Sequence, residues 1–400
     1  MLTSEPNVVD LRRSALRFIV LIGILSFFAD LAYEGARSVT GPFLGLLGAS
    51  AVIISSVGGL GELLGYGLRL VSGPLAERTG QYWHIAILGY ILQLTCVPLL
   101  AFAHSWPFAA LLILLERTGR AVRNPPRDAM VSFAAREMGY GWGFGLREAL
   151  DQFGALVGPL AVAAVLAERH SYNLAFAVMA IPVVVVFSLL ALARVMYPKP
   201  ERFDAETRET READLPRVFW IYLIGAALVA AGFADFALMA YHLQRNIPLQ
   251  QALVPVFYSA AMATSGAGSL LFGKLFDRYG MRVLIPLTVL GAAFAPLVFY
   301  GGFWVALIGV VIWGLGMGVH ESIIPAAVSH MVARSRRSSA YGTFTGIYGI
   351  AWFLGSVVIG LLYGKNLGAA VAFCVATQAA AIPIFMWVGT RLKISRADLR

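Results

Sequence analysis

Twelve long apolar runs constrain this chain more than any other feature of its sequence. They cover residues 17–44, 51–74, 83–103, 107–128, 141–166, 171–196, 218–243, 251–275, 282–300, 303–330, 341–364 and 368–390. A helix that crosses a bilayer needs about 20 predominantly apolar residues, and each run is close to or above that length. Leu, Ala, Ile and Val follow one another without period-two alternation, which predicts helices and not strands. The sequence therefore predicts an all-α membrane protein with twelve transmembrane helices.

The composition excludes a soluble globular protein of this length. Apolar residues make up 59% of the 400 positions and charged residues 13%, against roughly 25% charged residues in an average globular protein. A mean hydropathy of +0.75 would leave most of the surface of a water-soluble globule apolar. We therefore expect the lipid bilayer to surround the helices.

A strongly charged segment divides the apolar runs into two groups of six. Eleven of the twenty residues 198–217 are charged, with alternating signs, which is typical of a solvated and partly helical tether. We predict an N-terminal six-helix bundle over 1–197, a charged cytoplasmic linker over 198–217 and a C-terminal six-helix bundle over 218–400.

The basic residues between the runs gather on one side of the twelve-span arrangement. They lie mainly in short loops and form no basic soluble face, so the net charge of +9 does not indicate a nucleic-acid partner. On one side the loops carry the linker bases, the basic tail and Arg12, Arg13, Arg78, Arg136, Lys274, Arg278, Arg282, Arg334, Arg336 and Arg337. On the other side they carry only Arg169, Arg245 and Lys365. By the positive-inside rule, both termini and the linker are cytoplasmic.

The two groups of runs repeat each other in sequence. Residues 28–32 (FADLA) in the first run recur as residues 233–237 (FADFA) in the seventh. The pattern G-x-x-x-[DE]-R-x-G follows both the second and the eighth run. Its fixed positions, which we predict to lie in gating loops, are Gly73, Glu77, Arg78, Gly80, Gly273, Asp277, Arg278 and Gly280. Two parallel repeats enclosing a site near the bilayer midplane form one architecture of secondary transporters.

With these repeats the chain resembles the major facilitator superfamily over essentially its whole length. The two G-x-x-x-[DE]-R-x-G segments are the most specific markers, although Glu77 replaces the usual Asp in the first copy. Segments 26–34, 117–129 and 144–154 are similar to a prokaryotic group related to drug and metabolite exporters. The resemblance implies two pseudo-symmetric six-helix halves in a prokaryotic cytoplasmic membrane (the cell inner membrane) and transport of a small solute. We expect a multi-pass monomer that needs no cofactor.

Ionisable side chains inside the predicted helices are the candidate functional residues. Such groups are costly in the bilayer, so they pair with one another or face an aqueous cavity. In the first helix Asp30, Glu34 and Arg37 share one face because they are four and three residues apart. A carboxylate in a low-dielectric cavity can exchange a proton near neutral pH. We predict proton coupling by Asp30, Glu34, Glu148 and Asp151, and a substrate cavity lined by Tyr33, Arg37, Glu62, Arg123, Asp235, His242, His320 and Glu321.

A purely structural role for these charges is the alternative. The helices of the N-terminal half carry six acids and six arginines, a balance that predicts mutual neutralisation. The acids are Asp30, Glu34, Glu62, Glu116, Glu148 and Asp151, and the bases are Arg37, Arg69, Arg117, Arg120, Arg123 and Arg147. A neutralised network can hold helices together or line a gate without touching protons or substrate.

The leading hypothesis is a proton-coupled secondary active transporter that exports a small organic solute by antiport. One alternative is a proton symporter that imports an organic anion, with Arg37 and Arg123 as clamps for a carboxylate or phosphate. A passive channel would not need an acid–base network of this size. A lipid-handling or enzymatic membrane protein is a third alternative, but no Walker, H-E-x-x-H or G-x-S-x-G motif is present. We therefore expect no enzyme activity.

The two cysteines, Cys96 and Cys374, lie in apolar runs and suggest no metal cluster.

Overall fold

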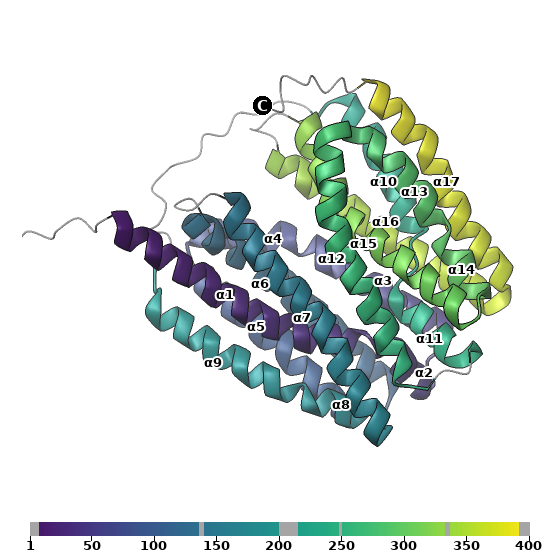
Figure 1. The fold of residues 1–400 in the computed structure, drawn as a ribbon, viewed down its shortest axis with the longest axis horizontal. Helices are drawn as coiled ribbons and strands as arrows, with labels where there is room; N and C mark the ends of the chain where they lie inside the picture. Colours follow the sequence, from purple (N-terminus) through teal and green to yellow (C-terminus); the bar gives the residue numbers. More distant parts are fainter. Residues whose placement is uncertain (1–7, 136–139, 200–214, 248–249, 333–336, 392–400) are drawn as a thin grey trace, which may run out of the picture.

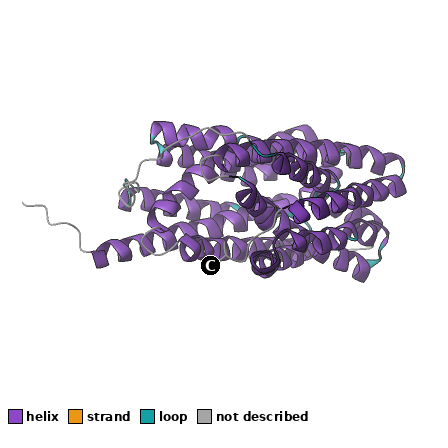
Figure 2. Ribbon diagram, turned by 90° about the horizontal axis from the view of Figure 1, so that it is seen from above, coloured by secondary structure: helices purple, strands orange, loops and turns teal. Residues whose placement is uncertain are grey.

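Long helices build the whole described part of the protein. The computed structural model describes residues 8–135, 140–199, 215–247, 250–332 and 337–391, and this part contains helices and loops but no strand (Figures 1 and 2). The N-terminal half contains α1 (Val8–Arg37), α2 (Thr40–Leu46), α3 (Ala51–Gly67), α4 (Arg69–Thr79), α5 (Tyr82–Leu99), α6 (Trp106–Ala135), α7 (Tyr140–Arg169), α8 (Tyr172–Val178) and α9 (Ala180–Met196). Most of the predicted linker lies outside the described residues.

The C-terminal half begins at α10 (Arg217–Ala231). It continues through α11 (Phe236–Asn246), α12 (Leu253–Tyr279), α13 (Leu284–Ala292), α14 (Phe294–Tyr300), α15 (Phe303–Met331), α16 (Arg337–Lys365) and α17 (Leu367–Arg391). Several apolar runs fold as two consecutive helices, as α10 and α11 do. There, Asp235 begins α11 as its N-cap, because its Oδ1 accepts a hydrogen bond from the N–H of Ala237 at 3.0 Å.

Nine helical stretches in the described residues are long and apolar enough to cross a membrane. They coincide with nine of the twelve predicted runs. The remaining three runs fall in α6, α12 and α15, which are 30, 27 and 29 residues long. The six residues Glu116, Arg117, Arg120, Arg123, Arg127 and Asp128 make α6 much less apolar than its neighbours. The all-helical membrane architecture is thus confirmed, and the count of twelve stays a prediction.

Two hydrophobic clusters form the core. One is built almost entirely from helices α1 to α9 and the other almost entirely from α10 to α17. Figure 1 shows the ribbons of the two halves meeting around α2 and α11 and diverging toward the side where α1 begins and α17 ends. At the meeting edge the contact is tight, since a methyl group on Gly41 would overlap the backbone of Ala237. The α2/α11 edge is therefore closed.

The two repeated glycine segments are helical where we expected loops. Residues 73–79 form the last turns of α4, and residues 273–279 form the last turns of α12. Gly80 and Gly280 then end the helices with φ of 65° and 62°, a backbone region that favours glycine. A methyl group on Gly73 would lie 3.5 Å from Pro125, and one on Gly273 would meet nothing within 4 Å.

Among the fixed positions of these segments, the charged side chains of Glu77, Arg78 and Arg278 are described, and all three are exposed. The side chain of Asp277 lies outside the described residues. A gating role for the two segments remains a prediction.

Candidate functional site

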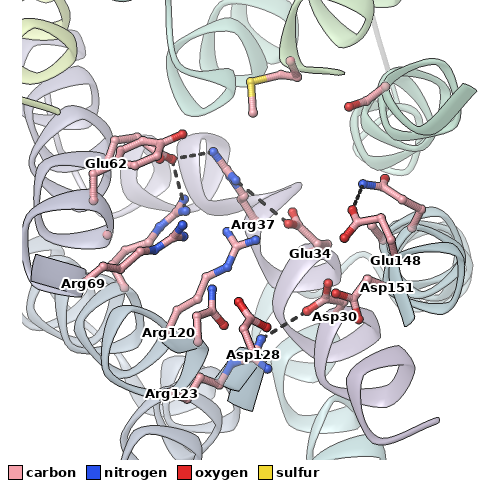
Figure 3. Close-up of a pocket in the computed structure, with 18 of the residues that line it drawn as sticks. Asp30, Glu34, Arg37, Glu62, Arg69, Arg120, Arg123, Asp128, Glu148 and Asp151 are labelled. Atoms are coloured by element: carbon pink, nitrogen blue, oxygen red, sulfur yellow. Dashed lines mark hydrogen bonds and ion pairs between the residues drawn. The ribbon is translucent and has the colours of Figure 1, made fainter. Parts of the chain in front are cut away.

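A polar cavity of about 460 Å³ lies between the two halves. Figure 3 shows its charged side chains pointing toward one another from the helices of the N-terminal half. Seven arginines and six acids line it, namely Arg37, Arg69, Arg117, Arg120, Arg123, Arg127, Arg147, Asp30, Glu34, Glu62, Asp128, Glu148 and Asp151. The C-terminal half contributes neutral residues to the lining, which are Met262, Ser265, Ser269, Met317, Phe344, Thr345 and Tyr348. Within the described residues, all the charge of the cavity therefore comes from one half.

Arg37, at the end of α1, is the centre of one ion-pair cluster. Its Nη2 lies 2.8 Å from Glu62 Oε1 on α3 and 3.9 Å from Asp235 Oδ2 in the other half. Its Nη1 lies 4.0 Å from Glu34 Oε1, one turn away on the same helix. Glu62 also pairs with Arg117 at 3.2 Å. Three carboxylates from α1, α3 and the N-cap of α11 thus surround one guanidinium.

Asp30 pairs with Arg123, which we predicted to line the substrate cavity. Its Oδ1 lies 3.3 Å from Nη2 of Arg123 on α6, and the side chains are almost fully enclosed, with exposed fractions of 7% for Asp30 and 1% for Arg123. The guanidinium of Arg123 also lies 4.7 Å from the centre of the Tyr90 ring. An adjacent guanidinium favours the ionised form of a carboxylate.

A third cluster joins α6 to α7. Arg147 bonds to Asp151, one turn along α7, and donates to Glu148 Oε2 at 2.8 Å. Arg127 on α6 lies 2.9 Å from Asp128 and 4.0 Å from Asp151. Asp151 therefore links the two helices.

The hydroxyl oxygen of Tyr33 accepts hydrogen bonds from three arginines. Arg37 donates to it at 3.1 Å and Arg120 at 2.8 Å, and Arg117 makes a third hydrogen bond. A neutral phenol accepts these bonds without cancelling any of the positive charge. Tyr33 thus orients the arginines around it.

Direct hydrogen bonds connect the two halves beside the cavity. The hydroxyl of Tyr258 on α12 donates to Glu34 Oε2 on α1 at 2.5 Å. The hydroxyl of Ser259 donates to the carbonyl of Leu156 on α7 at 2.7 Å. Glu34 and Arg37 therefore each contact the opposite half, through Tyr258 and Asp235.

Comparison with known proteins assigns the chain to a family. The Major Facilitator Superfamily matches residues 22–356, with a second match over 258–396. The chain belongs to the Major Facilitator Superfamily. An uncharacterized protein of Mycobacterium tuberculosis is 39% identical over 376 residues, which is 92% of each chain. The fosmidomycin resistance protein of Escherichia coli is 25% identical over 311 residues, or 74% of this chain and 73% of that protein.

A solved structure shows the same fold. The crystal structure of the nucleoside transporter NupG superposes with a TM-score of 0.74 over 94% of this chain and 100% of the other, at 12% identity. The chain is thus a multi-pass membrane transporter of the superfamily. The resemblance seen in the sequence is confirmed.

Seven of the predicted site residues line the cavity. They are Asp30, Glu34, Arg37, Glu62, Arg123, Glu148 and Asp151. Tyr33 and Asp235 stand behind the lining and contact it through Arg37. The side chains of His320 and Glu321 lie outside the described residues.

His242 lies apart from the cavity, contrary to the prediction. It repeats the position of Arg37, but its Nδ1 is 2.8 Å from the hydroxyl of Tyr363, and its ring packs edge-on against Phe299. The break before α11 separates His242 from the region that Arg37 reaches at the end of the continuous helix α1.

Equal numbers of acids and arginines were predicted to neutralise one another, but not every arginine forms an ion pair. In the described residues, Arg69 and Arg120 line the cavity without a carboxylate within 4.0 Å. The count of charges in the sequence included Arg69 and Arg120. The spacing of residues along one helix does not show which side chains of other helices lie beside them. Tyr66 and Tyr258 were missed because a tyrosine in an apolar run gives no distinctive signal.

Proposed function

We propose that this superfamily transporter couples the movement of a small organic solute to protons, by alternating access, and exports the solute by antiport. One observation carries the proposal. A cavity between the two halves is lined by the buried ion pair of Asp30 and Arg123, which are 3.3 Å apart. A carboxylate whose guanidinium partner comes from another helix can gain or lose that partner when helices move, and its proton with it.

The proposed moving parts are the two halves, over 1–197 and 218–400, each with six spans, joined by the linker 198–217. Support comes from the two separate hydrophobic clusters, which let each half move as a unit. The closed α2/α11 edge and the bonds of Tyr258 and Asp235 to α1 are then the contacts that break when the cavity opens on the other side.

The proposed orientation places both termini in the cytoplasm, as the basic loops predict. The divergent side of the two halves in Figure 1 then faces the cytoplasm. In this inward-facing arrangement Asp30 is paired with Arg123, and this pairing is proposed to favour release of its proton to the cytoplasm. Opening on the other side would separate the pair and allow proton uptake.

Export is favoured by the relatives. The fosmidomycin resistance protein of Escherichia coli is similar to most of this chain, and resistance follows when a membrane transporter removes a compound from the cell. A prokaryotic cytoplasmic membrane is the expected location. The protein is proposed to act as a monomer, because the cavity lies within one chain.

The experiment begins with a thermal-shift screen of small organic solutes on purified protein, because a specific ligand stabilises the folded state by mass action. Transport of the ligand is then measured in proteoliposomes with and without an imposed pH gradient. Antiport moves the solute against the direction of proton flow and symport moves it with that flow. A channel dissipates the gradient of the solute, and an enzyme consumes it without any gradient.

Asp30→Asn tests the proton carrier. The variant should abolish gradient-driven accumulation and keep the exchange of labelled for unlabelled solute. Glu168→Gln, at an exposed acid near the end of α7, is the matched control and should transport normally. Glu34→Gln should behave like Asp30→Asn only if the two acids share one proton. If Asp30→Asn still concentrates the solute, Asp30 is not the carrier, and Asp151 with Glu148 is the pair to examine next.

A further inference from the structure

Two arginines of the cavity have no carboxylate oxygen within 4.0 Å among the described residues. Arg69 begins α4 and Arg120 lies in the middle of α6, and both line the cavity. Each of the other five lining arginines has a carboxylate oxygen within 4.0 Å. The Nε atoms of Arg69 and Arg120 are also buried without a hydrogen-bond partner in the described part of the chain.

Neutral tyrosines hold these two guanidiniums in place. The guanidinium carbon of Arg69 lies 5.4 Å from the centre of the Tyr66 ring, and that of Arg120 lies 4.6 Å from the centre of the Tyr33 ring. Arg120 also donates to the Tyr33 hydroxyl at 2.8 Å. Cation–π contacts of this kind orient a cation and leave its charge intact.

The two guanidiniums repel each other. Arg120 is the charged group that acts most strongly on Arg69, and Figure 3 shows both side chains directed into the cavity from neighbouring helices. With all groups ionised, seven arginines face six acids in the lining. Arg69 and Arg120 are partly buried, and a charge that is partly removed from water without a counterion is unfavourable, so the cavity favours an anionic occupant.

A row of aromatic rings lies beside Arg69. The ring of Tyr66 is 5.6 Å from that of Tyr348 on α16, and Tyr348 stacks on Phe344 at 5.3 Å. Met317 also lines the cavity, and the described lining of the C-terminal half carries no charge. The cavity therefore has a cationic side and an apolar, aromatic side.

We propose that the transported solute is an amphipathic organic anion. Its carboxylate or phosphoryl-type head binds between Arg69 and Arg120, and its apolar body lies against Tyr66, Tyr348 and Phe344. Guanidinium groups bind both kinds of head through paired, charge-assisted hydrogen bonds. The cavity volume of about 460 Å³ is that of a small organic ligand site. This inference rests on the proposed function in naming the solute that the transporter moves.

The arginines that the sequence suggested as clamps are less suited to the task. Arg37 is occupied by Glu62 and Arg123 by Asp30. An anion that bound to either would have to displace a buried carboxylate. Arg69 and Arg120 can bind one without breaking an ion pair.

Equilibrium binding to the purified full-length protein tests the proposal, because it requires neither transport nor a proton gradient. The probes are phenylphosphonate and phenylacetate. Phenylacetamide is the uncharged analogue of phenylacetate, and inorganic phosphate is an anion that lacks the apolar ring. We expect both aromatic anions to bind at least about 10-fold more tightly than phenylacetamide, since one hydrogen bond to a charged group accounts for such a factor. We expect the same preference of about 10-fold over inorganic phosphate, since burial of a phenyl ring accounts for at least such a factor.

Substitutions at the two arginines locate the binding site. Arg69→Gln and Arg120→Gln should each weaken phenylphosphonate binding about 10-fold or more, and the corresponding lysine variants should restore part of it. Arg169→Gln, at an exposed residue ending α7, is the matched control and should bind normally. The melting temperature without a probe reports whether each variant is folded, and neither glutamine variant breaks an ion pair of the described residues.

Three results would overturn the inference: equal affinity for phenylacetamide and phenylacetate, equal affinity for inorganic phosphate and phenylphosphonate, or normal anion binding by both folded glutamine variants. Failure of the proposed function has a different signature. Anions would then bind as expected, while proteoliposomes would show no movement of the bound anion driven by a proton gradient.

Discussion

The hydrogen bond between Tyr258 and Glu34 provides a direct test of alternating access. It joins α12 to α1 at 2.5 Å, and both side chains are buried. Tyr258→Phe removes the hydroxyl alone, because the ring keeps its contact with Phe236 at 4.5 Å between centres. The perturbation therefore acts on one bond between the halves.

The size of the effect follows from the nature of the bond. A hydrogen bond to a charged group contributes about 1.5–3 kcal/mol. If the bond exists only in the observed state, its loss shifts the equilibrium toward the alternative state by a factor of about 10–150. A state that is about 1% populated in the wild type would then reach about 10–60% of the population.

Spin labels across the closed edge measure this shift. Leu46 on α2 and Trp304 on α15 are exposed, and each can be replaced by a labelled cysteine after Cys96 and Cys374 are replaced by alanine. The distance distribution, measured by double electron–electron resonance in nanodiscs, should gain a longer component in Tyr258→Phe.

Tyr90→Phe is the matched control. Its hydroxyl is buried in the N-terminal half and has no hydrogen-bond partner among the described residues, so its removal should leave the distribution unchanged. The reasoning is refuted if Tyr258→Phe gives the wild-type distribution, or if both variants change it equally.

Three further predictions concern helix packing, topology and capping. Gly355→Ala should lower the melting temperature, because the added methyl would overlap the backbone of Ala231 at a cost of about 1–3 kcal/mol. Gly273→Ala, where the methyl meets nothing within 4 Å, should not lower it, and equal losses would contradict the packing argument. A cysteine placed in the linker 198–217 should react in intact cells only with a membrane-permeant reagent, so labelling by an impermeant one would reverse the orientation. Asp235→Ala should destabilise the protein by about 1 kcal/mol through loss of the α11 N-cap. Asp235→Asn keeps an oxygen for the cap and loses the charge beside Arg37, so it should be more stable than Asp235→Ala in thermal unfolding, and equal stability of the two variants would contradict a contribution from the cap.

Much of the fold could be predicted because lipid imposes a simple rule on sequence. Every backbone polar group in the bilayer must be satisfied within the protein, so long apolar runs become helices. The repeats then indicated two related halves, and the match to the superfamily over residues 22–356 confirms the family. Helix ends were predicted less well, because the glycine segments at 73–80 and 273–280 remain helical almost to their last residue.

The candidate site was only partly predictable. Helical spacing correctly placed Asp30, Glu34 and Arg37 on one face, because neighbours within a helix are fixed by its geometry. The partners of these residues come from other helices, and no local pattern specifies them. Tyr258 illustrates this limit, since it lies 224 residues from Glu34 in sequence and bonds to it in the folded protein.

By itself, the sequence determined that this chain is a helical membrane protein of two related halves, because apolar length and repetition are properties of the chain alone. Only the tertiary structure decided which buried charges are neutralised. Arg123 meets Asp30 across two helices, whereas Arg69 and Arg120 meet tyrosines. Pairing depends on distances of a few ångströms between helices, which are set by packing. For the same reason His242, which repeats the position of Arg37 in the sequence, lies outside the cavity and contacts Tyr363.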